Sequence, residues 1–376
     1  MSATAARDER FMRVALALAE RELGRTWPNP SVGCVIVREG RIVGRGWTRR
    51  GGRPHAETEA LARAGEAARG AEAYVTLEPC NHTGQTPPCT HALLAAGIRR
   101  VVVGCIDPDP RVDGRGIAEL RAAGVTVEVG CLEAEARAQN LGLYRRIRDG
   151  RPMVALKLAL TLDGRIATRR GDSRWVSGER ARTEAHRLRA CHDAVAVGSG
   201  TALADDPELT CRLPGLEDSQ PVRVVFDRRL RLPPESTLAR TVARGPVWVL
   251  TRGDADPRRR AALEARGVEV MAVDGPFLRE ALGLLARRGL TRLLVEGGGT
   301  LAAALLLEGV VDRLHLVHAP LVFGAEGVAA VGALGLDRVG EAPRFRVVDE
   351  TRLGEDRLLV LEPEAETGRV GCSPGS

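Results

Sequence analysis

The chain has 376 residues, 44 % of them apolar, so it can form two domains with ordinary hydrophobic cores. Aromatic residues make up only 3 %, and the net charge of +6 is spread along the chain without a basic block. Both features argue against a nucleic-acid partner, because single-strand binding surfaces stack bases on aromatic side chains. No apolar run approaches the roughly 20 residues that span a bilayer, so no membrane partner is expected.

Eight cysteines occur in a long chain whose polar beginning, with Asp8 and Glu9, lacks the apolar segment of a secretory signal. This pattern is not typical of a disulfide framework. We therefore expect a cytoplasmic protein whose thiols are free or bound to metal.

The first part of the chain alternates between helical and strand-like patterns. Asp8 is a plausible N-cap for the first helix. The predicted helices cover residues 8–23, 57–68, 89–96 and 116–123, and the predicted strands cover residues 32–37, 42–47, 73–77, 100–105 and 125–129. Alternation of this kind predicts one α/β domain with a single sheet flanked by helices.

A polar, turn-forming segment at residues 148–152 marks the predicted domain boundary. We expect a first domain over residues 1–150, a second over 151–363 and a disordered tail over 364–376. Helical stretches lie between most strands of the second domain, which is therefore also α/β. Its predicted strands cover residues 153–160, 194–197, 223–226, 247–250, 268–271, 292–295 and 314–317, with a terminal hairpin of 344–348 and 357–361.

His55-Ala56-Glu57, Pro79-Cys80 and Cys89 match the signature of zinc-dependent deaminases. One imidazole and two thiolates can hold Zn²⁺ and leave a fourth position for water, whose pKa the metal lowers toward about 7. Glu57 cannot easily ligate the same ion, but it can move a proton from that water to a leaving amine.

The alternatives at this site are a structural zinc closed by His82 or His91, or buried thiols without metal. The spacing also departs from the usual Pro-Cys-x-x-Cys, because eight residues separate Cys80 from Cys89. A longer loop beside the metal changes the wall of the site and, with it, the substrate.

Two features stand out in the second half. Lys157 is the only lysine of the chain, which is explained either by a need for a compact ammonium or by chance. Gly297-Gly298-Gly299 follows a predicted strand and precedes a helix, so its backbone N–H groups either cradle a phosphate or simply form a tight turn. Similarly, Asp205 lies in a segment that could be no more than a capped turn.

Together these motifs resemble the bifunctional deaminase–reductases of riboflavin biosynthesis. The resemblance covers residues 8 to 362. In the first half it rests on Pro28-Asn29-Pro30-Ser31-Val32-Gly33, on His55-Ala56-Glu57 and on residues 76–89. In the second half it rests on Lys157-Leu158, Leu162-Asp163-Gly164, Trp175-Val176-Ser177 and residues 203–210 and 295–301.

The resemblance implies a cytidine-deaminase-like three-layer domain followed by a dihydrofolate-reductase-like α/β domain. The first would deaminate a diamino-(phosphoribosylamino)pyrimidinone with Zn²⁺, and the second would reduce its ribosyl group to ribityl with NADPH. Such an enzyme has a small phosphorylated pyrimidine as its partner, and we expect it to assemble as a homo-oligomer.

The resemblance also implies roles for individual residues. Lys157 would bind the ribosyl hydroxyls or help to polarise the reacting carbon, and Arg189 and Arg212 would clamp phosphate. The implied cofactor contacts are Ala159, Trp175, Thr201, Asp205, Gly297, Gly298, Gly299, Thr300 and Leu301. The implied substrate contacts are Ser173, Arg189, Leu209, Arg212 and Glu296. The preference for NADPH over NADH rests on the resemblance alone.

Two other functions compete with this interpretation. A nucleic-acid-editing deaminase would need an aromatic, basic channel, which the low aromatic content and the long loop between Cys80 and Cys89 disfavour. A zinc-bearing binding module without catalysis would not need Glu57 beside an open zinc position.

Overall fold

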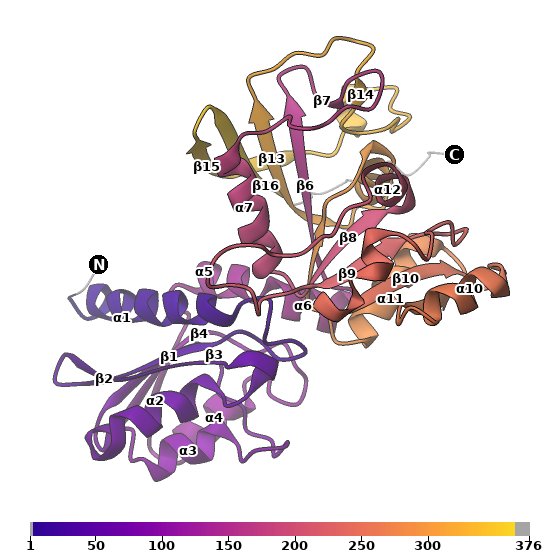
Figure 1. The fold of residues 1–376 in the computed structure, drawn as a ribbon. Coiled ribbons are helices and arrows are strands. Elements are labelled where there is room, and N and C mark those ends of the chain that lie inside the picture. The colour runs from indigo at the N-terminus through magenta and orange to yellow at the C-terminus, as the bar shows by residue number, and fades with distance from the viewer. Residues whose placement is uncertain (1–2, 365–376) are drawn as a thin grey trace, which may run out of the picture.

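The computed structural model describes residues 3–364, which form two α/β units, each built around its own large sheet (Figure 1). The N-terminal unit has five strands in the order β2-β1-β3-β4-β5. Strand β1 is antiparallel to β2 and β3, whereas β3, β4 and β5 are parallel. These strands are β1 Gly33–Arg38, β2 Arg41–Trp47, β3 Glu72–Leu77, β4 Arg100–Cys105 and β5 Thr126–Val129, which confirms every predicted strand of this half.

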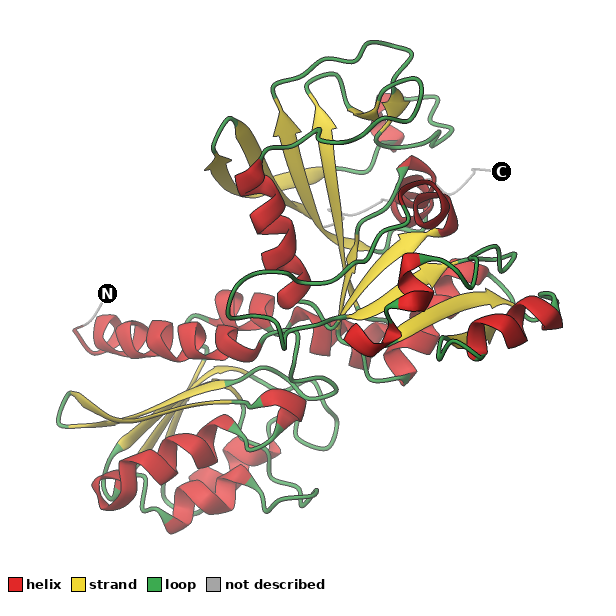
Figure 2. Ribbon diagram, viewed as in Figure 1, coloured by secondary structure: helices red, strands yellow, loops and turns green. Residues whose placement is uncertain are grey.

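Helices cover both faces of this sheet and give it three layers (Figure 2). On one face, Phe11 and Met12 of α1 pack on Val35 and Tyr74. Helix α1 approaches β1 so closely that a Cβ at Gly33 would lie 1.8 Å from a backbone oxygen of the helix. The opposite face packs against α2, α3 and α4. The helices of this unit are α1 Ala3–Ala19, α2 Ala56–Ala64, α3 Cys89–Ala95, α4 Arg115–Ala122, α5 Glu133–Gln139 and α6 Leu141–Asp149.

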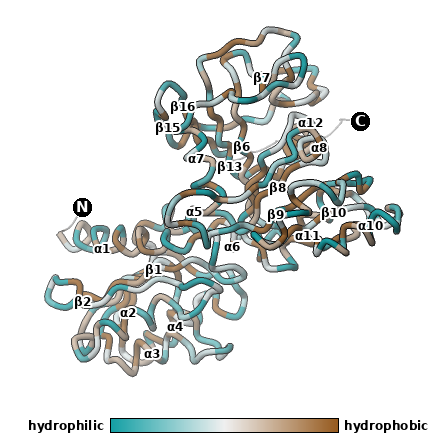
Figure 3. Tube along the Cα trace, in the orientation of Figure 1, coloured by the Kyte–Doolittle hydropathy of each residue, from teal (hydrophilic) through white to brown (hydrophobic). Residues whose placement is uncertain are grey.

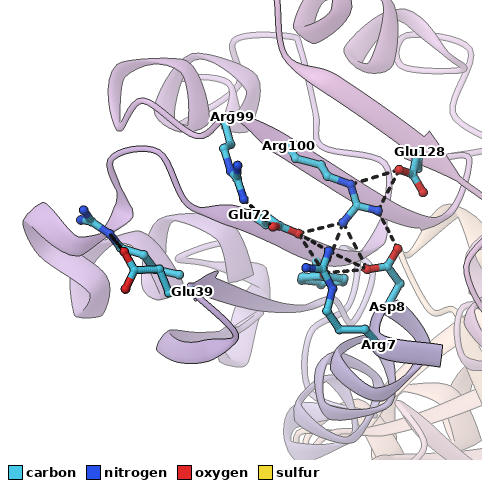
Figure 4. Close-up of polar contacts among 9 residues, drawn as sticks. Arg7, Asp8, Glu39, Glu72, Arg99, Arg100 and Glu128 are labelled. Carbon is cyan, nitrogen blue, oxygen red and sulfur yellow. Dashed lines mark hydrogen bonds and ion pairs between the residues drawn. The ribbon is translucent and has the colours of Figure 1, made fainter. Parts of the chain in front are cut away.

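Asp8 is not the N-cap that the sequence predicts, because α1 begins at Ala3 and carries Asp8 inside it. Its carboxylate is buried and lies 2.6 Å from the Arg100 guanidinium and 2.8 Å from the Tyr74 hydroxyl. Arg100 also contacts Glu72 and Glu128, each at 2.8 Å (Figure 4). Burial opposes ionisation of Asp8, but hydrogen bonds from Arg100 and Tyr74 outweigh it and lower its pKa. The network ties α1 to β3, β4 and β5.

We expect Asp8→Asn to destabilise the N-terminal unit by about 2 kcal/mol. The expected loss is smaller than the cost of breaking a fully buried ion pair, because Arg100 remains paired with the carboxylates of Glu72 and Glu128. The thermal midpoint of the unit should fall by roughly 4–8 °C in calorimetry at pH 7. Because the pKa of Asp8 is lowered in the fold, this stabilisation is present at neutral pH and is lost as the pH falls through that pKa.

The matched control is Glu128→Gln, which removes a carboxylate of the same network whose side chain is 53 % exposed. An exposed ion pair contributes less than about 1 kcal/mol, so this variant should melt near the wild type. Equal midpoints for Asp8→Asn and Glu128→Gln would show that the buried network does not stabilise the unit.

The second unit is a nine-stranded sheet in the order β11-β10-β9-β8-β12-β6-β13-β16-β15. It is parallel from β11 to β13, and the hairpin of β16 and β15 adds two antiparallel strands. All predicted strands and the predicted hairpin are present. The strands are β6 Met153–Thr161, β8 Ala194–Gly198, β9 Val222–Phe226, β10 Val247–Arg252, β11 Glu269–Val273, β12 Arg292–Val295, β13 Val311–Ala319, β15 Phe345–Leu353 and β16 Asp356–Pro363, with β7 Arg165–Ala167 and β14 Val328–Ala329 in a separate small sheet.

Helices again cover both faces, which confirms the predicted α/β class. Helices α11 and α12 pack on one face, and α7, α8, α9 and α10 pack on the other. Hydrophobic stretches run along the strands around β8 and β9, whereas α10 at the periphery is hydrophilic (Figure 3). The helices are α7 Glu179–Ala190, α8 Ser199–Asp205, α9 Thr237–Arg240, α10 Pro257–Glu264, α11 Phe277–Arg287 and α12 Gly299–Leu307. Short 3-10 turns cover Glu20–Glu22, Arg50–Gly52, Gly65–Ala68, Val242–Arg244 and Val339–Glu341.

Helix α6, which the sequence analysis does not predict, connects the two units. Tyr144 packs in the N-terminal core, while Arg145 lies 2.7 Å from Asp312 of the nine-stranded sheet. Arg151, just after the helix, also binds Asp312 with both of its terminal nitrogens, at 2.6 and 3.0 Å. The helix ends at Asp149, followed by Gly150 with φ +65°. Of the predicted tail, only Glu364 lies within the described residues.

Within residues 3–364, no helix combines the length and the apolar character that crossing a membrane requires.

Candidate active sites

The first site lies where one helix begins and where a strand leads through a loop into another helix. His55 immediately precedes α2, Cys80 follows β3, and Cys89 opens α3. The structure therefore places the three ligand candidates on the elements expected from the sequence. One imidazole nitrogen and the two sulfurs all lie within 4.8 Å of one another, and they form the metal-compatible cluster found among the described residues.

The distances fit zinc. The His55 Nδ1 atom lies 3.2 Å from the Cys89 sulfur and 3.6 Å from the Cys80 sulfur. A tetrahedral zinc with ordinary bond lengths separates its nitrogen and sulfur ligands by about 3.5–3.8 Å. The geometry thus needs only small adjustments to hold the ion, and it involves Nδ1 of His55.

The surroundings of Cys80 favour a thiolate. Its hydrogen bond with the Cys89 side chain is the main cause that lowers the pKa of Cys80, to about 4. The backbone N–H of Cys89, the first residue of α3, also points to the Cys80 sulfur at 3.4 Å. A helix N-terminus stabilises a thiolate in this position.

Glu57 lies in the first turn of α2, two residues after His55, and only 4 % of its surface is exposed. Burial raises the pKa of this carboxyl to about 7, and the charge of Cys80 adds to the effect. The Glu57 carboxyl is therefore held close to the three ligand atoms and is shielded from bulk solvent.

The loop after Cys80 contributes polar atoms beside the cluster, and His82, the alternative fourth ligand of a structural zinc, is not a member of the three-residue cluster. Asn81 Oδ1 and His82 Nδ1 are buried, and neither has a hydrogen-bond partner within the described part of the chain. Asp107 follows β4 and is 8 % exposed, and burial raises its pKa to about 7. The only signal for Asp107 in the sequence is its place after a buried strand, in Asp107-Pro108-Asp109-Pro110.

The second site lies toward the carboxyl ends of β6 and β12. Lys157 and Ala159 are both partly exposed and share one face of β6, as alternation predicts. The guanidinium of Arg189 on α7 binds the carboxylate of Glu296 with two hydrogen bonds, of 2.6 and 2.9 Å. Burial lowers the pKa of Lys157, while the charge of Glu296 raises it. Arg189 holds the pKa of Glu296 at about 2 against the effect of burial.

This arrangement brings together Lys157, Arg189 and Glu296, which the resemblance assigns to the reductase site. It also shows that the charge of Arg189 is already paired with Glu296. Arg212 is half-exposed and lies 3.5 Å from Glu208. Leu209 is buried with φ +58°, and Ser173 accepts a backbone hydrogen bond from Val176.

The implied cofactor residues gather where β8 leads into α8 and β12 leads into α12. The Gly298 N–H donates to the Thr201 hydroxyl at 3.1 Å, which joins the two turns. A Cβ at Gly299 would lie 2.6 Å from the Ala329 oxygen, so close packing alone requires glycine there. Thr300 and Leu301 continue into α12.

Asp205 and Trp175, the two implied cofactor contacts not yet placed, lie close to α8. Asp205 ends α8, and its carbonyl accepts a hydrogen bond from Arg174. Trp175 is 69 % exposed, and the guanidinium of Arg182 lies 4.6 Å from its ring centre.

Comparisons with known proteins cover both halves. Residues 5–105 match the cytidine and deoxycytidylate deaminase zinc-binding region, and residues 152–359 match the RibD C-terminal domain. The riboflavin biosynthesis protein RibD of Aquifex aeolicus is 42 % identical over 355 residues, which cover 94 % of this chain and 98 % of that protein. The RibD protein of Escherichia coli is 41 % identical over 374 residues, covering 94 % and 99 %.

Solved structures agree with the sequence relatives. Acinetobacter baumannii RibD is 38 % identical with a TM-score of 0.87, and the match covers 96 % of this chain and 100 % of that one. A Thermotoga maritima protein described as a diaminohydroxyphosphoribosylaminopyrimidine deaminase and 5-amino-6-(5-phosphoribosylamino)uracil reductase is 36 % identical with a TM-score of 0.85, covering 96 % and 99 %. The chain belongs to the RibD family of riboflavin biosynthesis proteins, in which a zinc-binding deaminase domain precedes a reductase domain.

Proposed function

We propose that the N-terminal domain deaminates 2,5-diamino-6-(5-phosphoribosylamino)pyrimidin-4-one and that the C-terminal domain reduces the ribosyl group of the product with NADPH, giving 5-amino-6-(5-phosphoribitylamino)uracil. The observation that carries the first step is the buried Glu57 carboxyl beside the cluster of His55, Cys80 and Cys89. Reduction is supported by the partly buried lone Lys157 beside the Arg189–Glu296 pair.

In the deaminase site, His55, Cys80 and Cys89 would hold the zinc. When bound, zinc lowers the pKa of water toward about 7 and so supplies a nucleophile at neutral pH. Glu57 would accept a proton from the attacking water and deliver it to the leaving amine, which would depart as ammonia. Asn81, His82 and Asp107 offer buried hydrogen-bonding groups to an amino-substituted pyrimidine.

In the reductase site, NADPH supplies the hydride that reduces the ribosyl carbon. Lys157 binds the ribosyl hydroxyls or polarises the reacting carbon from the face of β6 that it shares with Ala159. The substrate contacts proposed with it are Ser173, Arg189, Leu209, Arg212 and Glu296. The cofactor contacts are Ala159, Trp175, Thr201, Asp205, Gly297, Gly298, Gly299, Thr300 and Leu301.

The proposal extends to the cellular compartment of the enzyme, its domain boundary and its oligomeric state. A reducing cytoplasm suits an enzyme whose Cys80 and Cys89 must remain thiolates. We infer a division near Gly150, because each half carries its own sheet and its own site. We also expect a homo-oligomer that acts on a small molecule and has no nucleic-acid or membrane partner.

The experiment that tests both reactions follows ammonia release and NADPH oxidation separately on the diamino substrate. Lys157→Arg should lower reductase turnover at least about tenfold, because a planar guanidinium cannot put a point charge at the position of the ammonium. Ammonia release should not change, since the zinc cluster lies in the other domain. Near-normal reduction of the deaminated intermediate by this variant would show that the lone lysine is a compositional accident.

A further inference from the structure

We propose that Glu78 and Tyr144 are positioning residues of the deaminase site. They bind the peptide unit before Asp107 from its two sides and so hold the Asp107 carboxyl where it can bind the amino-substituted pyrimidine beside the zinc cluster. The inference rests on the proposed deamination and deepens it, because it explains how a side chain at the end of β4 is fixed next to ligands from β3 and α3.

The segment with Asp107 meets the zinc cluster because two neighbouring parallel strands end together. Strand β3 pairs with β4, and Leu77 lies opposite Cys105. The Glu78 N–H continues this pairing, since it donates to the Cys105 carbonyl at 2.9 Å. Glu78 thus begins the segment that leads to Cys80, while Asp107 lies two residues beyond β4. In open α/β sheets, ligands bind at this carboxyl edge.

The Asp107 carboxyl keeps one oxygen available for a ligand. Its Oδ1 atom accepts a hydrogen bond from the backbone N–H of Asp109, at 2.8 Å, whereas Oδ2 has no hydrogen-bond partner among residues 3–364. Burial raises the pKa of this carboxyl to about 7, and the charge of Cys80, one of the proposed zinc ligands, adds to the effect. The remaining oxygen can accept a hydrogen bond from an amino group of the pyrimidine.

Glu78 is not available to the substrate, because backbone N–H groups occupy both of its oxygens. The residue is 3 % exposed. Its Oε2 atom accepts hydrogen bonds from the N–H groups of Asp107 and Gly114, at 3.3 and 2.9 Å, and Oε1 accepts one from Ile117 at 3.2 Å. Hydrogen bonds to a carboxylate are among the stronger ones. A single side chain thus ties the Asp107 segment to the first turn of α4.

Tyr144 of α6 binds the other side of the same peptide unit. Its ring packs in the N-terminal core, and its hydroxyl donates to the Ile106 carbonyl at 2.5 Å. The peptide unit that joins Ile106 to Asp107 is therefore bound at its carbonyl by Tyr144 and at its N–H by Glu78. Because a peptide unit is planar, these two hydrogen bonds fix its orientation. They also fix the direction in which the Asp107 side chain leaves the backbone.

Close packing of α4 supports the same arrangement. A Cβ at Gly116, in the first turn of α4, would lie 2.2 Å from the Pro79 carbonyl oxygen and 3.3 Å from Glu78 Oε1. The helix therefore lies directly on the segment that continues to Cys80, and only glycine allows this approach. The surroundings of Asp107 are thus set before the substrate arrives, which reduces the entropy lost on binding.

The test uses the full chain and measures kcat/KM for ammonia release from the diamino substrate, together with zinc content. Glu78→Gln replaces an acceptor oxygen by an NH2 group that cannot accept the backbone hydrogen bonds. We expect kcat/KM to fall at least about tenfold while zinc is retained. Tyr144→Phe removes only the hydroxyl and should lower kcat/KM by about three- to tenfold. Reduction of the deaminated intermediate should not change in either variant.

A double-mutant cycle with Asp107→Ala separates positioning from a general structural role. Asp107→Ala should itself lower kcat/KM at least about tenfold, because it removes the substrate contact. If Glu78 and Tyr144 act through Asp107, their variants should each lower kcat/KM less than about twofold further in the Asp107→Ala background. Tyr144→Phe takes this cycle alone if Glu78→Gln does not fold.

Glu119→Gln is the matched control, because its carboxylate joins α4 to Thr90 and His91 of α3, at 3.1 and 3.0 Å, and does not bind the Asp107 segment. It should deaminate within about twofold of the wild type.

Three results would overturn the positioning roles alone, provided that the wild type deaminates. These are an Asp107→Ala variant with unchanged kcat/KM, losses that simply multiply in the double variants, and loss of zinc in Glu78→Gln. A wild type that released no ammonia would instead refute the proposed deamination.

Discussion

Glu57→Gln should leave zinc in place and reduce deamination by a factor on the order of 10²–10⁴ or more, as expected for loss of a general acid and base. The carboxamide has nearly the same shape, so the first turn of α2 and its contacts should persist. It cannot take a proton from water and return it to the leaving amine. Reduction of an already deaminated substrate should proceed as in the wild type, because that site lies on the other sheet.

Glu59→Gln is the matched control, two residues farther along the same helix. Its carboxylate pairs with Arg49 and Arg63, at 3.0 and 2.9 Å, and not with the zinc cluster. It should deaminate at the wild-type rate. Ammonia release is measured together with zinc content, so that a loss of metal cannot be mistaken for a loss of proton transfer. A Glu57→Gln variant that kept most of its deaminase activity would remove this residue from the mechanism.

The zinc cluster could be predicted from the sequence because its chemistry is local. His55 and Glu57 lie in one turn, and Cys80 and Cys89 flank one loop, so spacing alone brings them close. Asp107 could not be found this way. It comes from the next parallel strand, and only the pairing of β3 with β4 brings it to the same edge of the sheet.

The two errors in the N-terminal half have tertiary causes. Asp8 resembles an N-cap locally, but its carboxylate is buried against Arg100, 92 residues away, and the helix begins at Ala3. Helix α5 shows little apolar periodicity, since Ala136 is its only buried residue. Helix α6 is amphipathic, with Gly142, Leu143 and Tyr144 buried, but it is only nine residues long and follows directly on α5. In α6, Gly142 is explained by contact with the other domain, because a Cβ there would lie 2.4 Å from the Thr291 oxygen.

In the reductase site, too, local features could be predicted from the sequence, whereas contacts between distant segments could not. Alternation along β6 was enough to place Lys157 and Ala159 on one face. The pairing of Arg189 with Glu296 was not predictable, because the two residues lie 107 positions apart on α7 and at the end of β12. His192, just after α7, is 2 % exposed, and its Nδ1 lies 2.7 Å from the Leu188 oxygen in the last turn of that helix, so it caps the helix from a buried position.

Cys80→Ser and Cys89→Ser should each lose zinc and deaminase activity together. A three-ligand site requires about one zinc per chain in the wild type. Replacing a sulfur by a hydroxyl removes a thiolate ligand, and His55 with one cysteine cannot complete the site. Because metal binding also stabilises the folded state, the thermal midpoint of the N-terminal domain should fall as well.

Cys131→Ser is the control, since Cys131 is a partly buried cysteine of the same domain that lies outside the metal cluster. It should keep zinc and activity. Metal analysis of the purified proteins shows which variants lose zinc and which retain it. Stoichiometric zinc in both Cys80→Ser and Cys89→Ser would mean that other residues hold the metal. Zinc retained only in Cys89→Ser would mean that the Cys80 sulfur contributes most of the affinity, and zinc retained only in Cys80→Ser would mean that the Cys89 sulfur does.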